Sequence, residues 1–334
     1  MKKMIAILMA AMLILGLAAC GSSTTASTTA AATEAAAEAA VYHIGICQLM
    51  QHVALDAASE GFMDAIKEAV GEDNVVFDYQ DASGESSNCS VIINGFVSDD
   101  VDLILANATS PLQAAASATS TIPVLGTSIS DFATALDIDD WTGTVGGNIS
   151  GCSDLAPLDQ QAASIAELFP DAETVGLLYC SAEPNSVYQC DVIEGYLQEL
   201  GYTVARYTFT DSNDLAGVTQ TACEGSDVIY IPTDNTAASF TNTIADVVLS
   251  DTYKTPVFAG EEGICSGCGV ATLSISYYDL GYATGKMAVR ILVDGEDIST
   301  MPVETAANVT KEYNAANCEK FGITPPDGYV AIGG

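Results

Sequence analysis

Basic residues are scarce in this chain of 334 residues, which has 9 Lys and Arg against 44 Asp and Glu and a formal net charge of −35. A surface this acidic repels phosphate backbones, so nucleic-acid binding is excluded as an expected function. The charge bears on solubility and on encounter with partners, and it does not determine the fold. With 49% hydrophobic residues, the chain does not belong to the disordered class.

Histidine is almost absent, and the common catalytic motifs are missing. His43 and His52 are the two histidines, and the tight cysteine pair Cys265 and Cys268 lacks further ligands for zinc, so we expect no metal. The chain has no G-x-S-x-G elbow, P-loop or HExxH motif, and no G-x-G-x-x-G follows the first expected strand. No Ser or Cys is marked out as a partner of His52. We therefore predict neither an enzyme nor a cofactor.

The first twenty residues have the pattern of a secretion signal. Lys2 and Lys3 precede an apolar run over 4–19, and Cys20 is followed by Ser, Thr and Ala. This order predicts a signal peptide over 1–19, which is too short and wrongly flanked for a membrane span. No later stretch is apolar enough to span a membrane.

The cleavage site indicates how the protein is held at the cell surface. Residues 17–20, Leu-Ala-Ala-Cys, resemble a bacterial lipobox, which implies a lipid on Cys20 that anchors the protein to the extracytoplasmic face of the cell membrane. An ordinary signal peptide with a coincidental Cys and an uncleaved anchor are the alternatives. Residues 20–40 are nearly all Ala, Ser, Thr and Glu, and we expect a disordered linker there.

Ten cysteines are present, and removing Cys20 leaves an odd number, so at least one thiol has no disulfide partner. Secretion permits disulfides, and the pairing stays open. Cys265 and Cys268 form either a local disulfide or two free thiols. Cys47 and Cys180 sit at strand-like positions, where we expect small core residues.

Strand-like and helix-like segments alternate from residue 41 onward. Strands are expected at 43–47, 75–77, 101–105, 123–126, 175–179, 204–207, 228–231 and 257–259, with helices between them. This alternation predicts two consecutive α/β units with parallel sheets covered on both faces. The end of the chain offers a helix over 278–293, a strand over 304–309 and a helix from Lys311. These elements fit a chain that crosses back between two lobes.

Polar side chains follow strand after strand. In open parallel sheets, ligands bind beyond the carboxyl ends of the strands, and for any single residue helix capping is the competing explanation. Ser110, Thr127 and Ser128 can receive a carboxylate with their hydroxyls and helix-start N–H groups, while Asp234 or Glu183 can pair with an ammonium. Together they describe a site for a zwitterion. The full set of expected ligand-binding residues is Gln48, Ser110, Thr127, Ser128, Glu183, Asn185, Ser186, Asp234, Asn235 and Glu261.

Several of these segments carry a family resemblance. Residues 44–58 closely resemble the opening pattern "IGI-Q---HPALDA" of the ABC-transporter substrate-binding lipoproteins that include tryptophan- and tyrosine-binding members. Further blocks match in the same order, at 108–111, 124–128, 182–186, 232–236 and 277–281. The resemblance covers about 41–310 and departs from the pattern at Val53, where proline is usual. The run from Cys265 to Cys268 is a further unusual feature.

The resemblance implies a type I periplasmic-binding fold with two doubly wound parallel-sheet lobes and a three-segment hinge. We expect lobe 1 over 41–150 and 276–306, lobe 2 over 151–275 and 307–334, and crossings near 148–153, 273–277 and 306–310. It also implies a monomer that captures a small solute between the lobes and delivers it to an ABC permease and ATPase complex.

An amino acid with an aromatic side chain is the expected ligand. Asp234 and Asn235 are expected near its amine, and Phe132, Tyr188 and Tyr277 are candidates for stacking on its ring. A sugar- or nucleoside-binding protein of the same fold, or a sensor or adhesin without transport, remain the alternatives.

Overall fold

The computed structural model describes residues 41–306 and 308–333. The predicted signal peptide, Cys20 and the linker lie outside these residues. None of the helices in the described part of the chain combines the length and the apolarity that a membrane span requires.

The first lobe is built on a six-stranded sheet within the described residues. Its strands are β1 (Tyr42–Gln48), β2 (Val75–Asp81), β3 (Leu103–Asn107), β4 (Val124–Ile129), β5 (Ile149–Ser153) and β11 (Glu304–Thr305). Its helices are α1 (Val53–Val70), α2 (Ser86–Ser98), α3 (Thr109–Ala118), α4 (Phe132–Ala135) and α11 (Tyr277–Leu292), with short 3-10 turns η1 (Glu72–Asn74) and η2 (Ile298–Thr300). The strand order is β11-β5-β4-β3-β1-β2, and all of its pairings are parallel.

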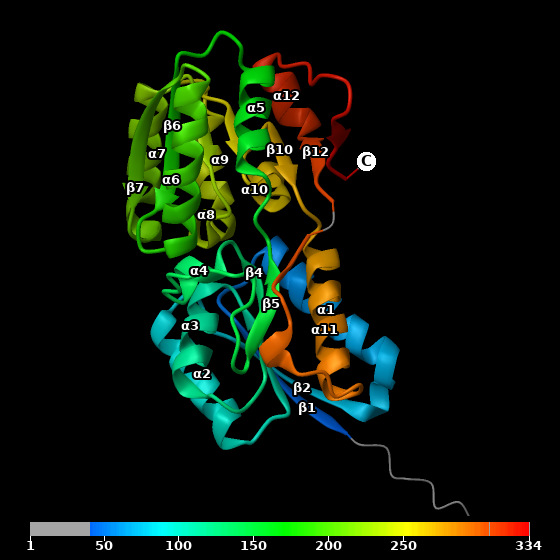
Figure 1. Ribbon diagram of the computed structural model, residues 1–334. Helices are drawn as coiled ribbons and strands as arrows, with labels where there is room; N and C mark the ends of the chain where they lie inside the picture. Colours follow the sequence, from blue (N-terminus) through cyan, green and yellow to red (C-terminus); the bar gives the residue numbers. More distant parts are fainter. Residues whose placement is uncertain (1–40, 307, 334) are drawn as a thin grey trace, which may run out of the picture. The chain divides into compact units, whose positions relative to one another are not determined.

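Alternate residues of the strands face opposite helical layers, as the two-residue period of a strand requires. Ile44 and Ile46 of β1 pack with α1 and α11, whereas Cys47 packs with α2 and α3. The helices α1 and α11 lie side by side on one face of the sheet (Figure 1). Their close approach depends on small residues, since a Cβ on Gly281 would lie 1.9 Å from the backbone oxygen of Ala58.

The second lobe repeats this plan. Its strands are β6 (Thr174–Cys180), β7 (Thr203–Phe209), β8 (Val228–Ile231), β9 (Val257–Ala259), β10 (Ala271–Ser274), β12 (Thr310–Tyr313) and β13 (Val330–Ala331). Its helices are α5 (Leu158–Leu168), α6 (Pro184–Glu199), α7 (Ser212–Gly225), α8 (Asn235–Ser239), α9 (Thr241–Val248), α10 (Glu262–Gly267) and α12 (Ala315–Phe321). The order is β13-β12-β10-β9-β8-β6-β7, with β10 and β12 antiparallel and the other pairs parallel.

The chain passes between the two sheets at three places, after β5, between β10 and α11, and between β11 and β12 (Figure 1). This arrangement confirms the predicted fold of two doubly wound lobes with a three-segment hinge. The expected lobe boundary at residue 150 falls inside β5, which stays paired in the first sheet up to Ser153. The first crossing therefore lies a few residues later, between Ser153 and Leu158.

Three expected elements differ from the structure. The helix expected from Lys311 begins at Ala315 instead, because Lys311 pairs with Leu273 in β12 and the Asn314 side chain caps α12. The strand expected over 304–309 pairs only at Glu304–Thr305. The single helix expected before β9 is divided into α8 and α9 at Phe240, whose φ of −118° and ψ of 31° are not helical. The elements α4, β5, β10, α10 and β13 were not predicted.

The cysteines of the described residues are all buried free thiols: Cys47, Cys89, Cys152, Cys180, Cys190, Cys223, Cys265, Cys268 and Cys318. Cys265 and Cys268 are therefore two free thiols in the structure and do not form the local disulfide that was the alternative. Within residues 41–306 and 308–333, no group of three or more His, Cys, Asp or Glu side chains is arranged to hold a metal.

Candidate functional site

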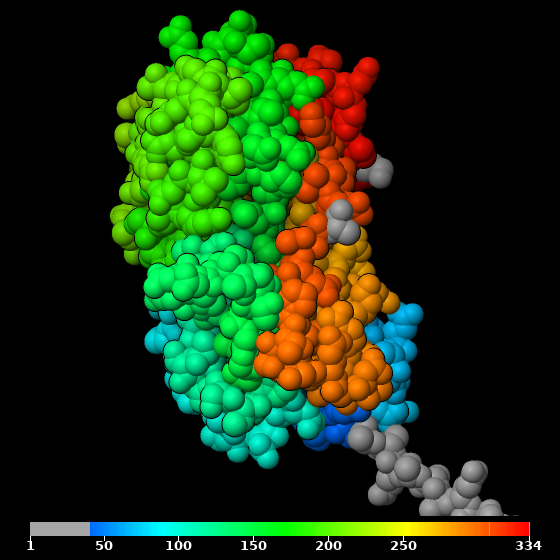
Figure 2. All heavy atoms as spheres, viewed as in Figure 1, coloured from blue at the N-terminus to red at the C-terminus, as the bar shows by residue number. Residues whose placement is uncertain are grey.

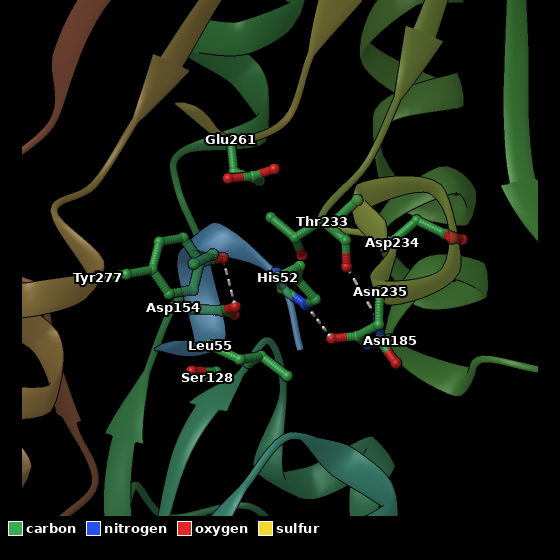
Figure 3. Close-up of a pocket in the computed structure, with 12 residues that line it drawn as sticks. His52, Leu55, Ser128, Asp154, Asn185, Thr233, Asp234, Asn235, Glu261 and Tyr277 are labelled. Carbon is green, nitrogen blue, oxygen red and sulfur yellow. Dashed lines mark hydrogen bonds between the residues drawn. The ribbon is translucent and has the colours of Figure 1, made fainter. Parts of the chain in front are cut away.

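One pocket collects residues from both lobes at the carboxyl ends of their strands. It encloses about 290 Å³ of non-atom space, including its opening to solvent. Figure 3 shows side chains from both lobes converging on it. The lining residues are His52, Ala54, Leu55, Ser128, Asp154, Asn185, Thr233, Asp234, Asn235, Ala238, Glu261 and Tyr277.

Half of the predicted binding residues line this pocket: Ser128, Asn185, Asp234, Asn235 and Glu261. They come from the ends of β4, β8 and β9 and from the first turn of α6. Loops that follow parallel strands meet at one edge of a sheet, which is why residues far apart in sequence converge here.

The other five predicted residues, Gln48, Ser110, Thr127, Glu183 and Ser186, do not line the pocket. Gln48 is buried, donates to Asp56 Oδ1 at 2.6 Å and accepts from Ser59 Oγ at 2.7 Å. It therefore ties β1 to α1 behind the site. Thr127 is buried 3.2 Å from Thr284 Oγ1 on α11.

Ser110 and Ser186 also contact other protein groups. Ser110 Oγ accepts from Ser86 Oγ at 3.1 Å, in α2. Ser186 is fully buried, and its Oγ accepts from Asn185 Nδ2 at 3.3 Å. The Ser110 hydroxyl thus links α3 to α2, and the Ser186 hydroxyl bonds to its neighbour within α6.

Glu183 and Asp234 both act as helix caps. Asn235 N and Nδ2 donate to Glu183 Oε2 at 2.9 and 2.7 Å, and Thr236 N and Oγ1 donate to Glu183 Oε1 at 2.9 and 2.7 Å. Asp234 accepts from Ala237 N at 2.8 Å and from Cys180 N at 2.7 Å. The Asp234 carboxyl group points away from His52 (Figure 3). Both of its oxygens are thus already bonded to backbone donors.

Asp154 is the acidic group that sequence reasoning missed. It follows β5 directly, is 4% exposed, and accepts a hydrogen bond from the Tyr277 hydroxyl at 2.8 Å through Oδ2 (Figure 3). Because β5 was not predicted, Asp154 was not among the residues expected to follow a strand. The stacking candidate Tyr277 lies in the pocket, whereas Phe132 packs in the core of lobe 1 and Tyr188 lies outside the pocket.

Three polar atoms in this pocket are buried and have no hydrogen-bond partner in the described part of the chain. They are His52 Nδ1, Ser128 Oγ and Asp154 Oδ1. Buried polar groups are almost always paired, and leaving one unpaired costs about 1–3 kcal/mol. Their convergence on one cavity indicates that they are the groups a ligand would bind.

The electrostatics of the pocket are acidic. Among the described residues, no Lys or Arg lines it. Burial raises the pKa of Asp154 above its ordinary value and that of Glu261 to about 7, and burial also raises the pKa of Asp234 to about 8. Burial lowers the pKa of His52. A cationic group placed among these carboxylates would stabilise their ionised forms.

Hydrogen bonds join the two lobes across the pocket. His52 Nε2 lies 3.3 Å from Asn235 Oδ1, and Gln189 Nε2 donates to Ser130 Oγ at 2.9 Å. Ser130 Oγ is also 3.4 Å from Thr233 Oγ1. In the space-filling view, side chains of the two lobes meet along their boundary (Figure 2). The structure is therefore in a closed arrangement.

The chain is similar in sequence to known substrate-binding proteins. The family model described as "ABC transporter substrate binding protein" matches residues 43–331. The tyrosine-binding protein of Clostridioides difficile strain R20291 is 33% identical over 265 residues, covering 79% of this chain and 76% of that protein. These two matches extend over both lobes.

Two solved structures are similar over most of their length. An ABC domain in complex with L-Trp from Streptococcus pneumonia has 31% identity and a TM-score of 0.82, covering 86% of this chain and 97% of that one. The ligand-free, open structure of a substrate-binding protein with adhesive properties from Clostridium difficile has 34% identity and a TM-score of 0.67, covering 87% and 99%. The higher score with the ligand-bound relative agrees with the closed arrangement.

Proposed function

Because this chain belongs to the family of ABC transporter substrate-binding proteins, we propose that it is the extracytoplasmic lipoprotein component of an ABC importer. It captures an α-amino acid with an aromatic side chain and delivers it to a membrane permease. Members of this family bind their substrates without converting them, so the chain is a binding protein and not an enzyme.

The observation that carries the choice of an amino acid is the pair of unpartnered atoms on Ser128 and Asp154. Asp154 Oδ1 can accept a charge-assisted hydrogen bond from an ammonium, which also supplies the countercharge that the acidic pocket lacks. Ser128 Oγ can donate to a carboxylate. We assign the amine to Asp154, because both oxygens of Asp234 are occupied by backbone donors.

The aromatic preference is supported by the relatives and by the lining of the pocket. One relative is a tyrosine-binding protein and another was solved with L-Trp. Tyr277 and Leu55 provide aromatic and apolar surface beside the polar atoms, and offset stacking on Tyr277 suits a flat ring.

Closure of the lobes is the proposed mechanism of capture. A ligand that touches Ser128 on lobe 1, Asp154 at the first crossing, and Thr233 or Asn235 on lobe 2 gains all of its contacts only in the closed state. Such a ligand shifts the population toward that state. The permease would then recognise the closed, loaded protein.

The proposed anchor rests on the N-terminal segment, and the proposed partners rest on membership of the family. Lipid on Cys20 would hold a monomer at the membrane while the linker over 20–40 lets it reach the permease and ATPase complex. Labelling of cells with a radioactive fatty acid tests this arrangement: the unmodified protein should carry the label and Cys20→Ala should not, whereas equal labelling of the two would contradict a lipid on Cys20.

Blocked analogues test the zwitterion site. Calorimetric titration of the purified protein with L-tyrosine, N-acetyl-L-tyrosine and tyramine should show binding of the free amino acid alone, since each analogue removes one charged group. Equal affinity for all three would contradict the assignment of Asp154 and Ser128. Uptake of labelled tyrosine by cells with and without the gene then separates an importer component from a sensor or adhesin.

A further inference from the structure

The orientation of the Asn235 side chain is fixed by its neighbour Glu183. The Asn235 amide nitrogen Nδ2 donates to Glu183 Oε2 at 2.7 Å, and three further donors from Asn235 and Thr236 converge on the same carboxylate. A carboxylate surrounded by donors accepts hydrogen bonds. The amide nitrogen of Asn235 therefore faces Glu183, and its oxygen Oδ1 faces His52.

This orientation determines which nitrogen of His52 carries the hydrogen. Asn235 Oδ1 is an acceptor, so His52 Nε2, 3.3 Å away, is the donor of that bond. Burial lowers the pKa of His52 and outweighs the opposite effects of Asn235, Glu183 and Asp56, so the ring is neutral. A neutral imidazole with its hydrogen on Nε2 has a free lone pair on Nδ1.

The lone pair of His52 Nδ1 has no donor in the described residues. The side chain as a whole is only partly buried, but the Nδ1 atom itself is shielded from solvent and unpaired. The ring lines the pocket that also holds Ser128 and Asp154. A donor brought by the ligand would satisfy this buried acceptor.

We propose that His52 Nδ1 accepts a hydrogen bond from the side chain of the bound amino acid, so that the site selects an aromatic ring bearing an O–H or N–H group. The assignment rests on the proposed function, in which Asp154 and Ser128 take the ammonium and carboxylate and leave His52 for the side chain. A phenol O–H and an indole N–H are such donors, and a plain phenyl ring has none. A ligand without such a donor, such as phenylalanine, should bind much more weakly, because it leaves the buried His52 Nδ1 acceptor unpaired.

Calorimetric titration with L-phenylalanine, L-tyrosine and L-tryptophan tests the assignment. The unmodified protein should bind the better of tyrosine and tryptophan at least about tenfold more tightly than phenylalanine. In His52→Phe, which keeps a flat ring and removes the acceptor, that preference should fall below about threefold. His43→Phe is the matched control, because His43 is the other histidine and is exposed outside the pocket; it should keep the full preference.

The tautomer provides a second readout that needs no variant. Nitrogen-15 NMR of the histidine-labelled, unmodified protein at neutral pH should show hydrogen on Nε2 and none on Nδ1 of His52. A hydrogen on Nδ1, or a full preference retained in His52→Phe, would overturn the assignment while binding of the amino acids leaves the proposed function standing. Failure of all three amino acids to bind would overturn both.

Discussion

Replacing Asp154 by Asn should separate ligand affinity from stability. The change keeps the size of the side chain and removes the charge of a carboxyl group that is 4% exposed. Its Oδ1 is the unpaired oxygen facing the pocket, and its Oδ2 accepts from the Tyr277 hydroxyl. The variant thus loses the proposed partner of the ligand ammonium and leaves the surrounding packing in place.

The magnitude follows from the kind of bond that is lost. A hydrogen bond to a charged group contributes about 1.5–3 kcal/mol, so the dissociation constant for L-tyrosine should rise about 10- to 150-fold. The unliganded protein should be at least as stable as before, because no Lys or Arg lines the pocket to compensate this buried carboxylate.

Calorimetry for affinity and thermal unfolding without ligand measure the two effects. Asp159→Asn is the matched control, since Asp159 is exposed on α5 and its loss changes the net charge by the same amount. It should bind as the unmodified protein does. Affinity of Asp154→Asn within twofold of the control would refute the assignment of the ammonium.

Three further predictions concern other groups around the pocket. Asp234→Ala should lower stability by about 1–2 kcal/mol, because it removes the cap of α8; chemical denaturation showing no loss would contradict the capping role. Burial raises the pKa of Glu261 from 4.5 to about 7, so the folded state binds more protons in that interval and the free energy of unfolding should fall as pH rises from 4.5 through about 7. Glu261→Gln should flatten that fall, and an unchanged slope in denaturation at pH 5, 6 and 8 would count against it. Gln189→Leu removes the bond to Ser130 that joins the lobes and should weaken ligand binding about 2- to 13-fold through loss of about 0.5–1.5 kcal/mol from the closed state; calorimetric affinity equal to that of the unmodified protein would show that the bond does not favour closure.

The fold was predictable because it depends on a repeated local pattern. Apolar strands such as β1 and β8 alternate with amphipathic helices, and this alternation alone predicts a parallel sheet covered by helices. One missed element and one misplaced element show the limits of this pattern. The missed strand β5 is short and contains Ser150 and Gly151 among its apolar residues, and the misplaced helix α12 begins only after the cap Asn314. Their positions depend on pairing with distant strands, which local patterns do not record.

The site was predictable only in part. Strand ends directed attention to Ser128, Asn235 and Glu261, which line the pocket. The same rule could not distinguish a side chain that faces the ligand from one whose oxygens are bonded to the backbone at a helix start, as both oxygens of Asp234 and of Glu261 are. Asp154 was missed because it follows a strand that the sequence does not mark. Orientation of a side chain depends on its three-dimensional neighbours.

Ligand-induced stabilisation of the purified protein tests the central claim most directly. Thermal unfolding in the presence of each L-amino acid, a set of sugars and a set of nucleosides reports any ligand that binds the folded state, since such a ligand raises Tm by mass action. The account predicts a rise in Tm with tyrosine or tryptophan and none with sugars or nucleosides. A rise confined to a sugar or a nucleoside would contradict the account of the site.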